Sequence, residues 1–128
     1  MSAQRPVPVG NYSLLEDYEC PSASVRVIRM GKGGERVDLH MHLRSMQLYV
    51  VLSGQVVVES DGVEHLLEPY RPLAVWPRSA HGVRPVTDEA VVMNISIPPL
   101  SADDQGPLED DRVPPDYGLP SDASDIED

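Results

Sequence analysis

Between residues 24 and 97 the chain alternates short apolar segments with turn residues. Val, Ile and Leu dominate these segments, which is typical of short strands. Asp61-Gly62 separates two such segments and favours a type I′ hairpin, because that turn needs positive φ at both central residues. The pattern predicts eight strands: Ser24–Met30, Arg36–His42, Gln47–Ser53, Gln55–Ser60, Val63–Glu68, Leu73–Trp76, His81–Val86 and Ala90–Ile97.

Strands of this length at roughly ten-residue spacing, with no helical period, predict an all-β fold. An antiparallel sandwich or barrel fits, and a jelly roll of six to eight strands is one such arrangement. The strand pattern by itself does not distinguish the jelly roll from other β-sandwiches. At 128 residues the chain is long enough for one core only.

The segments on either side differ from this central region. Residues 1–23 have mixed character and are interpreted as an N-terminal lead-in to a barrel over 24–100. Residues 101–128 contain ten Asp and Glu against Arg112, and prolines recur from Pro98 onward. Acidic repulsion and few apolar residues predict an acidic, Pro-rich, largely disordered C-terminal tail. The alternative is that Val113 to Tyr117 docks onto a barrel or a partner.

Three histidines are the candidate chemical groups. His40 and His42 are two residues apart in a predicted strand, so their side chains point to the same face, with Cα atoms roughly 7 Å apart. Two imidazoles at this spacing can converge on one ion, and His81 on another strand could complete a three-nitrogen cap. A His-x-His pair alone is equally compatible with a solvated surface pair.

The residues around these histidines carry a family resemblance. Gly34, His40, His42, Gln47 and Gly54 follow one another at the spacing of the first motif of the cupin superfamily, which they resemble. The segment from Trp76 to Val83, with its proline and His81, is similar to the second motif. The chain departs from the family at Arg71, Ser79 and Pro85, and by one residue missing between Pro77 and His81. The resemblance implies a double-stranded β-helix, or jelly-roll barrel.

The resemblance also implies one divalent metal ion per chain, held by His40, His42 and His81. Gln47 stands where metal-binding cupins usually have a glutamate, and its amide oxygen is a candidate fourth ligand. Alternatively, Gln47 hydrogen-bonds a water molecule or a neighbouring strand. Neutral ligands would leave the full +2 charge on the site, which would attract an anion. Fe, Mn, Ni, Cu and Zn all fit such a donor set.

Strand parity adds further candidates. Tyr49 shares the inward parity of Gln47 and could orient a substrate or a metal-bound water molecule. Arg36 shares the parity of His40 and could pair with an anion at the mouth of the pocket. Gln47, Tyr49 and Arg36 are therefore the candidate catalytic residues. Trp76, Met93 and Ile95 are expected to form barrel core or pocket wall. Asn94 would face inward only if the last strand had the opposite parity.

Charge and hydropathy exclude some classes of binding partner. Of the net charge of −11, residues 101–128 carry ten acids minus Arg112, or −9, which leaves −2 for residues 1–100. Because no basic stripe is present, nucleic acid and anionic membranes are poor partners. No signal peptide or apolar stretch of membrane-spanning length occurs, and we expect a cytoplasmic protein. Cys20, the one cysteine, is expected to be a spectator.

Two functions are consistent with these features. The first is a metal-dependent enzyme acting on a small, anionic or enolisable molecule, with dioxygenase or isomerase/cyclase type chemistry. The second is a non-catalytic cupin module that senses a metal or a small ligand; a purely structural barrel is disfavoured by the three histidines. A homodimer is expected, because an open β-sandwich leaves edge strands and apolar faces to cover.

Overall fold

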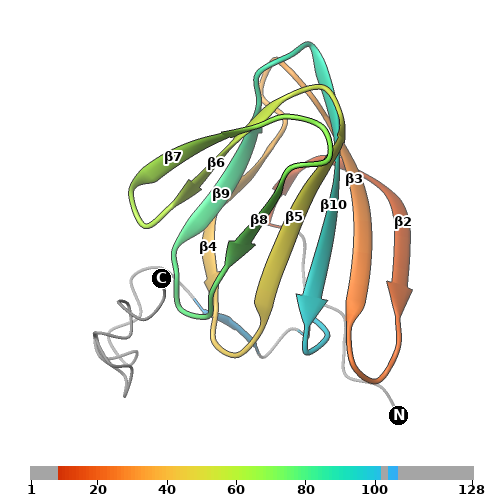
Figure 1. The fold of residues 1–128 in the computed structure, drawn as a ribbon, viewed down its shortest axis with the longest axis vertical. Helices are drawn as coiled ribbons and strands as arrows, with labels where there is room; N and C mark the ends of the chain where they lie inside the picture. Colours follow the sequence, from red (N-terminus) through yellow and green to blue (C-terminus); the bar gives the residue numbers. More distant parts are fainter. Residues whose placement is uncertain (1–8, 102–103, 107–128) are drawn as a thin grey trace.

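The computed structural model describes residues 9–101 and 104–106, which form a sandwich of two antiparallel sheets (Figure 1). One sheet has the order β1-β4-β9-β6-β7, with β11 added to β4, and the other has the order β2-β3-β10-β5-β8. Within the described residues there is no helix that could cross a membrane. The strands are β1 Gly10–Asn11, β2 Ser13–Glu19, β3 Ser24–Gly31, β4 Arg36–His42, β5 Met46–Ser53, β6 Val56–Ser60, β7 Val63–Leu67, β8 Pro72–Val75, β9 His81–Pro85, β10 Glu89–Ile97 and β11 Gln105–Gly106.

The eight predicted strands are confirmed as β3 to β10, with ends that differ by one residue at most. The predicted hairpin joins β6 to β7, where Ser60 pairs with Val63 across a two-residue turn. Asp61 and Gly62 have φ values of 53° and 83°, as a type I′ turn requires.

Three further strands lie outside the predicted barrel limits of 24 and 100. β2 pairs along β3 although its side chains are mostly exposed, so its sequence, Ser-Leu-Leu-Glu-Asp-Tyr-Glu, shows no alternation of apolar and polar positions. β11 pairs with the end of β4, at His42 and Met41. Part of the assigned lead-in and the first residues of the assigned tail are therefore integral to the sandwich. The docking alternative for Val113 to Tyr117 falls outside the described residues.

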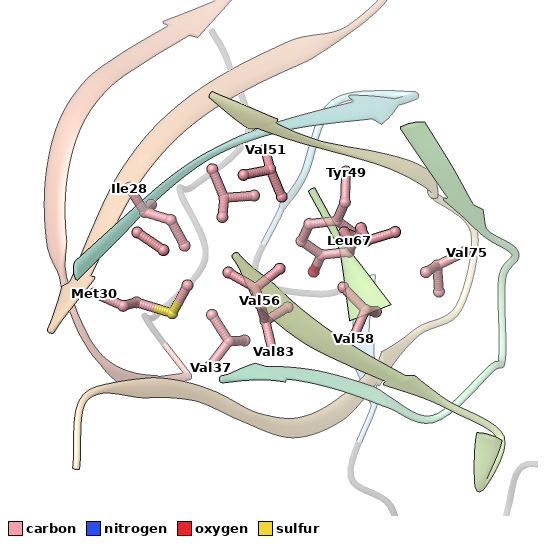
Figure 2. Packing of buried hydrophobic residues seen from close by; sticks show 12 residues of the cluster. Ile28, Met30, Val37, Tyr49, Val51, Val56, Val58, Leu67, Val75 and Val83 are labelled. Atoms are coloured by element: carbon pink, nitrogen blue, oxygen red, sulfur yellow. The ribbon is translucent and has the colours of Figure 1, made fainter. Parts of the chain in front are cut away.

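The core lies between the two sheets (Figure 2). β3, β5 and β10 each bury alternate side chains, as their burial patterns show. On β10 the inward residues are Ala90, Val92, Asn94 and Ser96, which is the opposite parity to the expected one. The assignment of Met93, Ile95 and Trp76 to core or pocket wall is wrong, because Met93 and Ile95 lie on the outer face of the sheet and Trp76 is 54% exposed.

An irregularity in β4 decides which of its side chains face inward. The pairing of β4 with β9 shifts register between Val37 and His40, so Asp38 and Leu39 are both exposed. Val37 before the shift and His42 after it are buried. Gly82 on β9 lies directly under the shift, where a Cβ atom would come within 2.9 Å of the Val37 carbonyl oxygen. The absence of a side chain at Gly82 therefore allows the irregular strand to approach.

Candidate metal centre

The three histidines meet at one end of the sandwich. His40 and His42 end β4, and His81 begins β9, where it pairs directly with His40. Their ring centroids lie 4.4 to 5.6 Å apart. One nitrogen from each ring lies within 4.8 Å of the others, which is roughly twice the ~2.1 Å length of a metal–nitrogen bond. A small inward movement would bring all three nitrogens to one ion.

Contacts at Nδ1 orient two of the rings. Nδ1 of His40 lies 2.7 Å from the carbonyl oxygen of Asp38, and Nδ1 of His81 lies 2.9 Å from that of Ser79. A carbonyl only accepts, so each of these contacts is a hydrogen bond in the tautomer that carries the proton on Nδ1 and presents a lone pair at Nε2. Nδ1 of His42 lies 3.6 Å from the carboxylate of Asp104, and its buried Nε2 has no hydrogen-bond partner within the described residues. In this tautomer Nε2 of each ring has a lone pair for a ligand, and that of His81 lies 2.8 Å from Gln47 Oε1.

Burial keeps His40 and His81 in the state that binds metal. It lowers the pKa of His40 to about 4 and that of His81 to about 3, with mutual repulsion between the rings adding to the effect. Both imidazoles are therefore neutral near pH 7. Neutral imidazole is the form that coordinates a divalent ion.

Gln47 contributes a fourth candidate ligand beside the histidines. Its Oε1 lies 2.8 Å from Nε2 of His81, yet both atoms are acceptors when His81 Nδ1 donates to Ser79. Two acceptors at this distance repel each other. A divalent ion held by both atoms would offset that repulsion, because imidazole nitrogen and amide oxygen can both bind such ions. The donor set of three imidazoles and one amide oxygen therefore fits a divalent ion.

The orientation of Gln47 is set by its neighbours. Its Nε2 donates to Oδ1 of Asn94 at 3.3 Å and to Oγ of Ser96 at 3.1 Å, and Ser96 in turn donates to the same Asn94 oxygen. The Tyr49 hydroxyl donates to Gln47 Oε1 at 3.1 Å, and burial raises the pKa of Tyr49. Tyr49 is therefore a neutral donor. These bonds hold the amide oxygen toward His81.

Asp104 is a site residue that sequence reasoning missed. Its carboxylate is buried and accepts from the backbone N–H groups of Arg44 at 2.5 Å and Ser45 at 3.2 Å. Burial opposes its ionisation, but the interactions with His42, Ser45 and Arg44 outweigh burial and lower its pKa. A negative charge beside Nδ1 of His42 makes that ring a better ligand. No pattern in the sequence links Asp104 to His42, since 62 residues separate them.

A cavity of about 40 Å³ lies beside the histidines, and His40, His42, Gln47 and Tyr49 line it. Arg36 does not line this cavity. The register shift after Val37 breaks the parity on which that prediction depended, and Arg36 instead pairs with Asp38 on the exposed face, at 2.9 Å.

Two other lining residues, Arg26 and Asn94, were not predicted as site residues. Arg26 is in phase with buried Ile28 and Met30 on β3, a signal that strand parity could have supplied.

Comparisons with known proteins identify the fold. No protein-family profile and no curated protein matches the sequence. Among solved structures, the TT1209 protein of Thermus thermophilus is 22% identical, with a TM-score of 0.65 over 70% of this chain and 85% of that chain. A Klebsiella pneumoniae protein with a double-stranded β-helix domain is 18% identical, with a TM-score of 0.60 over 75% and 84%. A cupin protein of Bacteroides fragilis is 18% identical, with a TM-score of 0.61 over 77% and 86%. This chain therefore has the cupin fold, a double-stranded β-helix.

Proposed function

We propose that this protein is a metal-dependent cupin enzyme that acts on a small anionic or enolisable molecule. The observation that carries the proposal is the convergence of His40, His42 and His81, whose ligand nitrogens lie within 4.8 Å of one another. Gln47 Oε1 lies 2.8 Å from Nε2 of His81 and adds an oxygen to this set. His40, His42, His81 and Gln47 would hold one Fe, Mn, Ni, Cu or Zn ion. A bound divalent ion polarises a coordinated oxygen and stabilises negative charge that develops on it.

The remaining groups of the site suggest how the chain would assist. With four neutral ligands the ion keeps its full +2 charge, which favours an enolate or carboxylate over a neutral molecule. Tyr49 is held as a neutral hydroxyl that hydrogen-bonds to Gln47, so it fixes the ligand amide and is placed to position a substrate oxygen. Dioxygenase or isomerase/cyclase type chemistry is compatible with these roles. The small cavity favours a small substrate.

Metal analysis tests the proposal first. Protein purified without an affinity tag should contain close to one divalent ion per chain, and His81→Ala should lower metal affinity by about 100-fold or more. His65→Ala is the matched control, because His65 lies on β7 outside the cluster. Wild-type metal content in the His81→Ala protein would refute the site.

Turnover then separates an enzyme from a binding module. The metal-loaded protein should consume oxygen or isomerise a member of a panel of small diketones, oxo acids and catechols, and the His81→Ala protein should not. A protein that binds metal and ligand without turnover on such a panel would instead be the metal- or ligand-sensing module.

We also propose a homodimer. Strands β3, β5 and β10 carry apolar residues on both faces, and Val27, Val50 and Met93 on the outer face are only partly buried. Sheets that are apolar on both faces are usually covered on both. Light scattering at tens of micromolar should give twice the chain mass of 14.1 kDa, and a monomer would contradict the proposal.

A further inference from the structure

Two buried donors of the cavity point to a ligand that nothing above assigns. Nε of Arg26 and Nδ2 of Asn94 are buried, and neither has a hydrogen-bond partner within the described residues. Arg26 is 9% exposed and Asn94 6%. Leaving a buried donor without a partner is unfavourable, and more so for a charged group. Both side chains line the same cavity as His40 and His42.

The sheet places these donors side by side. Asn94 of β10 pairs directly with Arg26 of β3, and directly paired residues on one face have Cβ atoms about 5 Å apart. The Asn94 amide is oriented, because its Oδ1 accepts from Gln47 and Ser96, which leaves Nδ2 as the group without a partner. Two adjacent N–H donors, one of them on a guanidinium, are suited to an acceptor with negative charge.

The surroundings restrict that anion. Asp17 of β2 pairs with Arg26, and its carboxylate oxygen lies 3.7 Å from Nε of Arg26, beyond hydrogen-bond distance but near enough to offset part of the charge. A partly compensated guanidinium favours a single negative charge over a double one. The cavity volume of about 40 Å³ corresponds to about three water molecules. A carboxylate group fits both limits, whereas a phosphate monoester has twice the charge and greater bulk.

We propose that Arg26 and Asn94 form a carboxylate subsite, so that the substrate is a short carboxylic acid bound between this pair and the histidines. One carboxylate oxygen accepts hydrogen bonds from Arg26 Nε and Asn94 Nδ2, and the rest of the molecule extends toward His40 and His42. The inference deepens the proposed function, on which it rests for the identification of the bound acid as the substrate.

Acetate is the probe, with acetamide as its neutral counterpart and inorganic phosphate as a bulkier anion of higher average charge. Binding is followed by NMR titration of the full chain, both metal-free and loaded with zinc. Arg26→Gln removes the charge from the subsite and should weaken acetate binding at least tenfold in both forms. Arg29→Gln is the matched control, because Arg29 is on the same strand, on the outer face, where it pairs with Glu89 at 3.6 Å. Its acetate affinity should stay within twofold of wild type.

Asn94→Asp provides an independent test. The substitution keeps an oxygen for Gln47 and Ser96 but replaces the free donor by an acceptor, so it should weaken acetate binding at least tenfold. This variant also decides the question if Arg26→Gln does not fold. Acetate affinity within twofold of wild type in the folded variants would overturn the subsite, as would acetamide binding as tightly as acetate or phosphate binding more tightly than acetate.

Metal content separates this subsite from the proposed function. Both subsite variants should keep wild-type zinc stoichiometry, because the three histidines are unchanged and Asn94→Asp keeps an oxygen that accepts from Gln47. A protein that binds no metal but whose acetate affinity depends on Arg26 and Asn94 would refute the metal enzyme and support the subsite. A protein that binds zinc, but whose acetate affinity is the same in wild type and variants, would refute the subsite alone.

Discussion

The interior of the sandwich has an apolar half and a polar half, although the same strands build both. In the five-stranded sheet, Ile28, Val92 and Val51 lie opposite one another in one row across the strands. Two residues along, the corresponding row is Arg26, Asn94 and Tyr49. The change from core to site therefore occurs within a single strand repeat. The residues that stabilise the fold and those of the candidate site therefore lie on the same strands. Single substitutions in one row or the other can test their effects on stability and on metal binding separately.

The largest effect is expected from the apolar half. Met30 on β3 is fully buried in the core cluster, and Met30→Ala should lower the free energy of unfolding by about 2–5 kcal/mol through lost burial and a residual cavity. Its zinc affinity, measured where the protein is still folded, should stay within twofold of wild type. Chemical denaturation and metal titration of Met30→Ala and His81→Ala give the comparison. Equal loss of metal in both variants would show that the two halves are not separable.

The polar half should make stability dependent on pH. Folding lowers the pKa of His40 to about 4 and that of His81 to about 3, from 6.5. Between the folded and unfolded pKa values the unfolded chain binds more protons than the folded one. The free energy of unfolding is therefore highest above pH 6.5 and decreases as the pH falls toward 4 and 3. Each histidine contributes up to about 1.4 kcal/mol per pH unit.

Denaturation of the metal-free protein between pH 7.5 and 4 measures this dependence. His81→Ala should remove a large part of the slope, whereas His65→Ala should leave it unchanged. A flat profile in the wild-type protein would mean that the histidines are solvated. With zinc bound, stability should be higher at pH 7 and should fall more steeply on acidification, because protons and metal compete for the same nitrogens.

Two truncations test whether Asp104 and β11 contribute to the metal site. Ending the chain after Gly106 keeps Asp104 and β11, and we expect the melting temperature and zinc affinity to change little. Ending it after Ser101 removes the carboxylate beside His42 and the acceptors for the N–H groups of Leu43, Arg44 and Ser45. Loss of such an outer contact to a metal ligand typically lowers affinity 10–100-fold. Calorimetry and zinc titration of the two proteins measure these effects. If both truncated proteins had the same melting temperature and zinc affinity, the role assigned to Asp104 would be wrong.

The features predicted from the sequence are those that depend on local pattern. Short apolar segments bounded by turn residues located eight strands, and the i, i+2 spacing brought His40 and His42 to one face, because both effects operate within a single strand. The error at Arg36 arose from the register shift in β4, which leaves no signature in alternation because it depends on the approach of Gly82 from β9. Asp104 was missed because its contact with His42 is made only by the folded chain. The parity of β10, and so the position of Asn94, is likewise set by pairing with β3 and β5.

The substitution Gln47→Glu tests whether Gln47 contacts the metal ion. It changes the charge of the side chain with almost no change in its size. We expect it to fold, since the Tyr49 hydroxyl can still donate to the carboxylate that replaces the amide. A negative charge close to a divalent ion should tighten zinc roughly tenfold or more. The same charge lowers the net charge of the site from +2 to +1, so anion binding to the zinc form should weaken.

Gln55→Glu is the matched control for this substitution. It makes the same chemical change near β6, where Gln55 bonds to Glu68 on the exposed surface, and it should alter neither affinity. Zinc and acetate titrations on the three proteins give the answer. Unchanged affinities in the Gln47→Glu protein would show that Gln47 does not contact the ion. The contact of its Oε1 with His81 would then be a structural one, and the three histidines alone would form the metal centre.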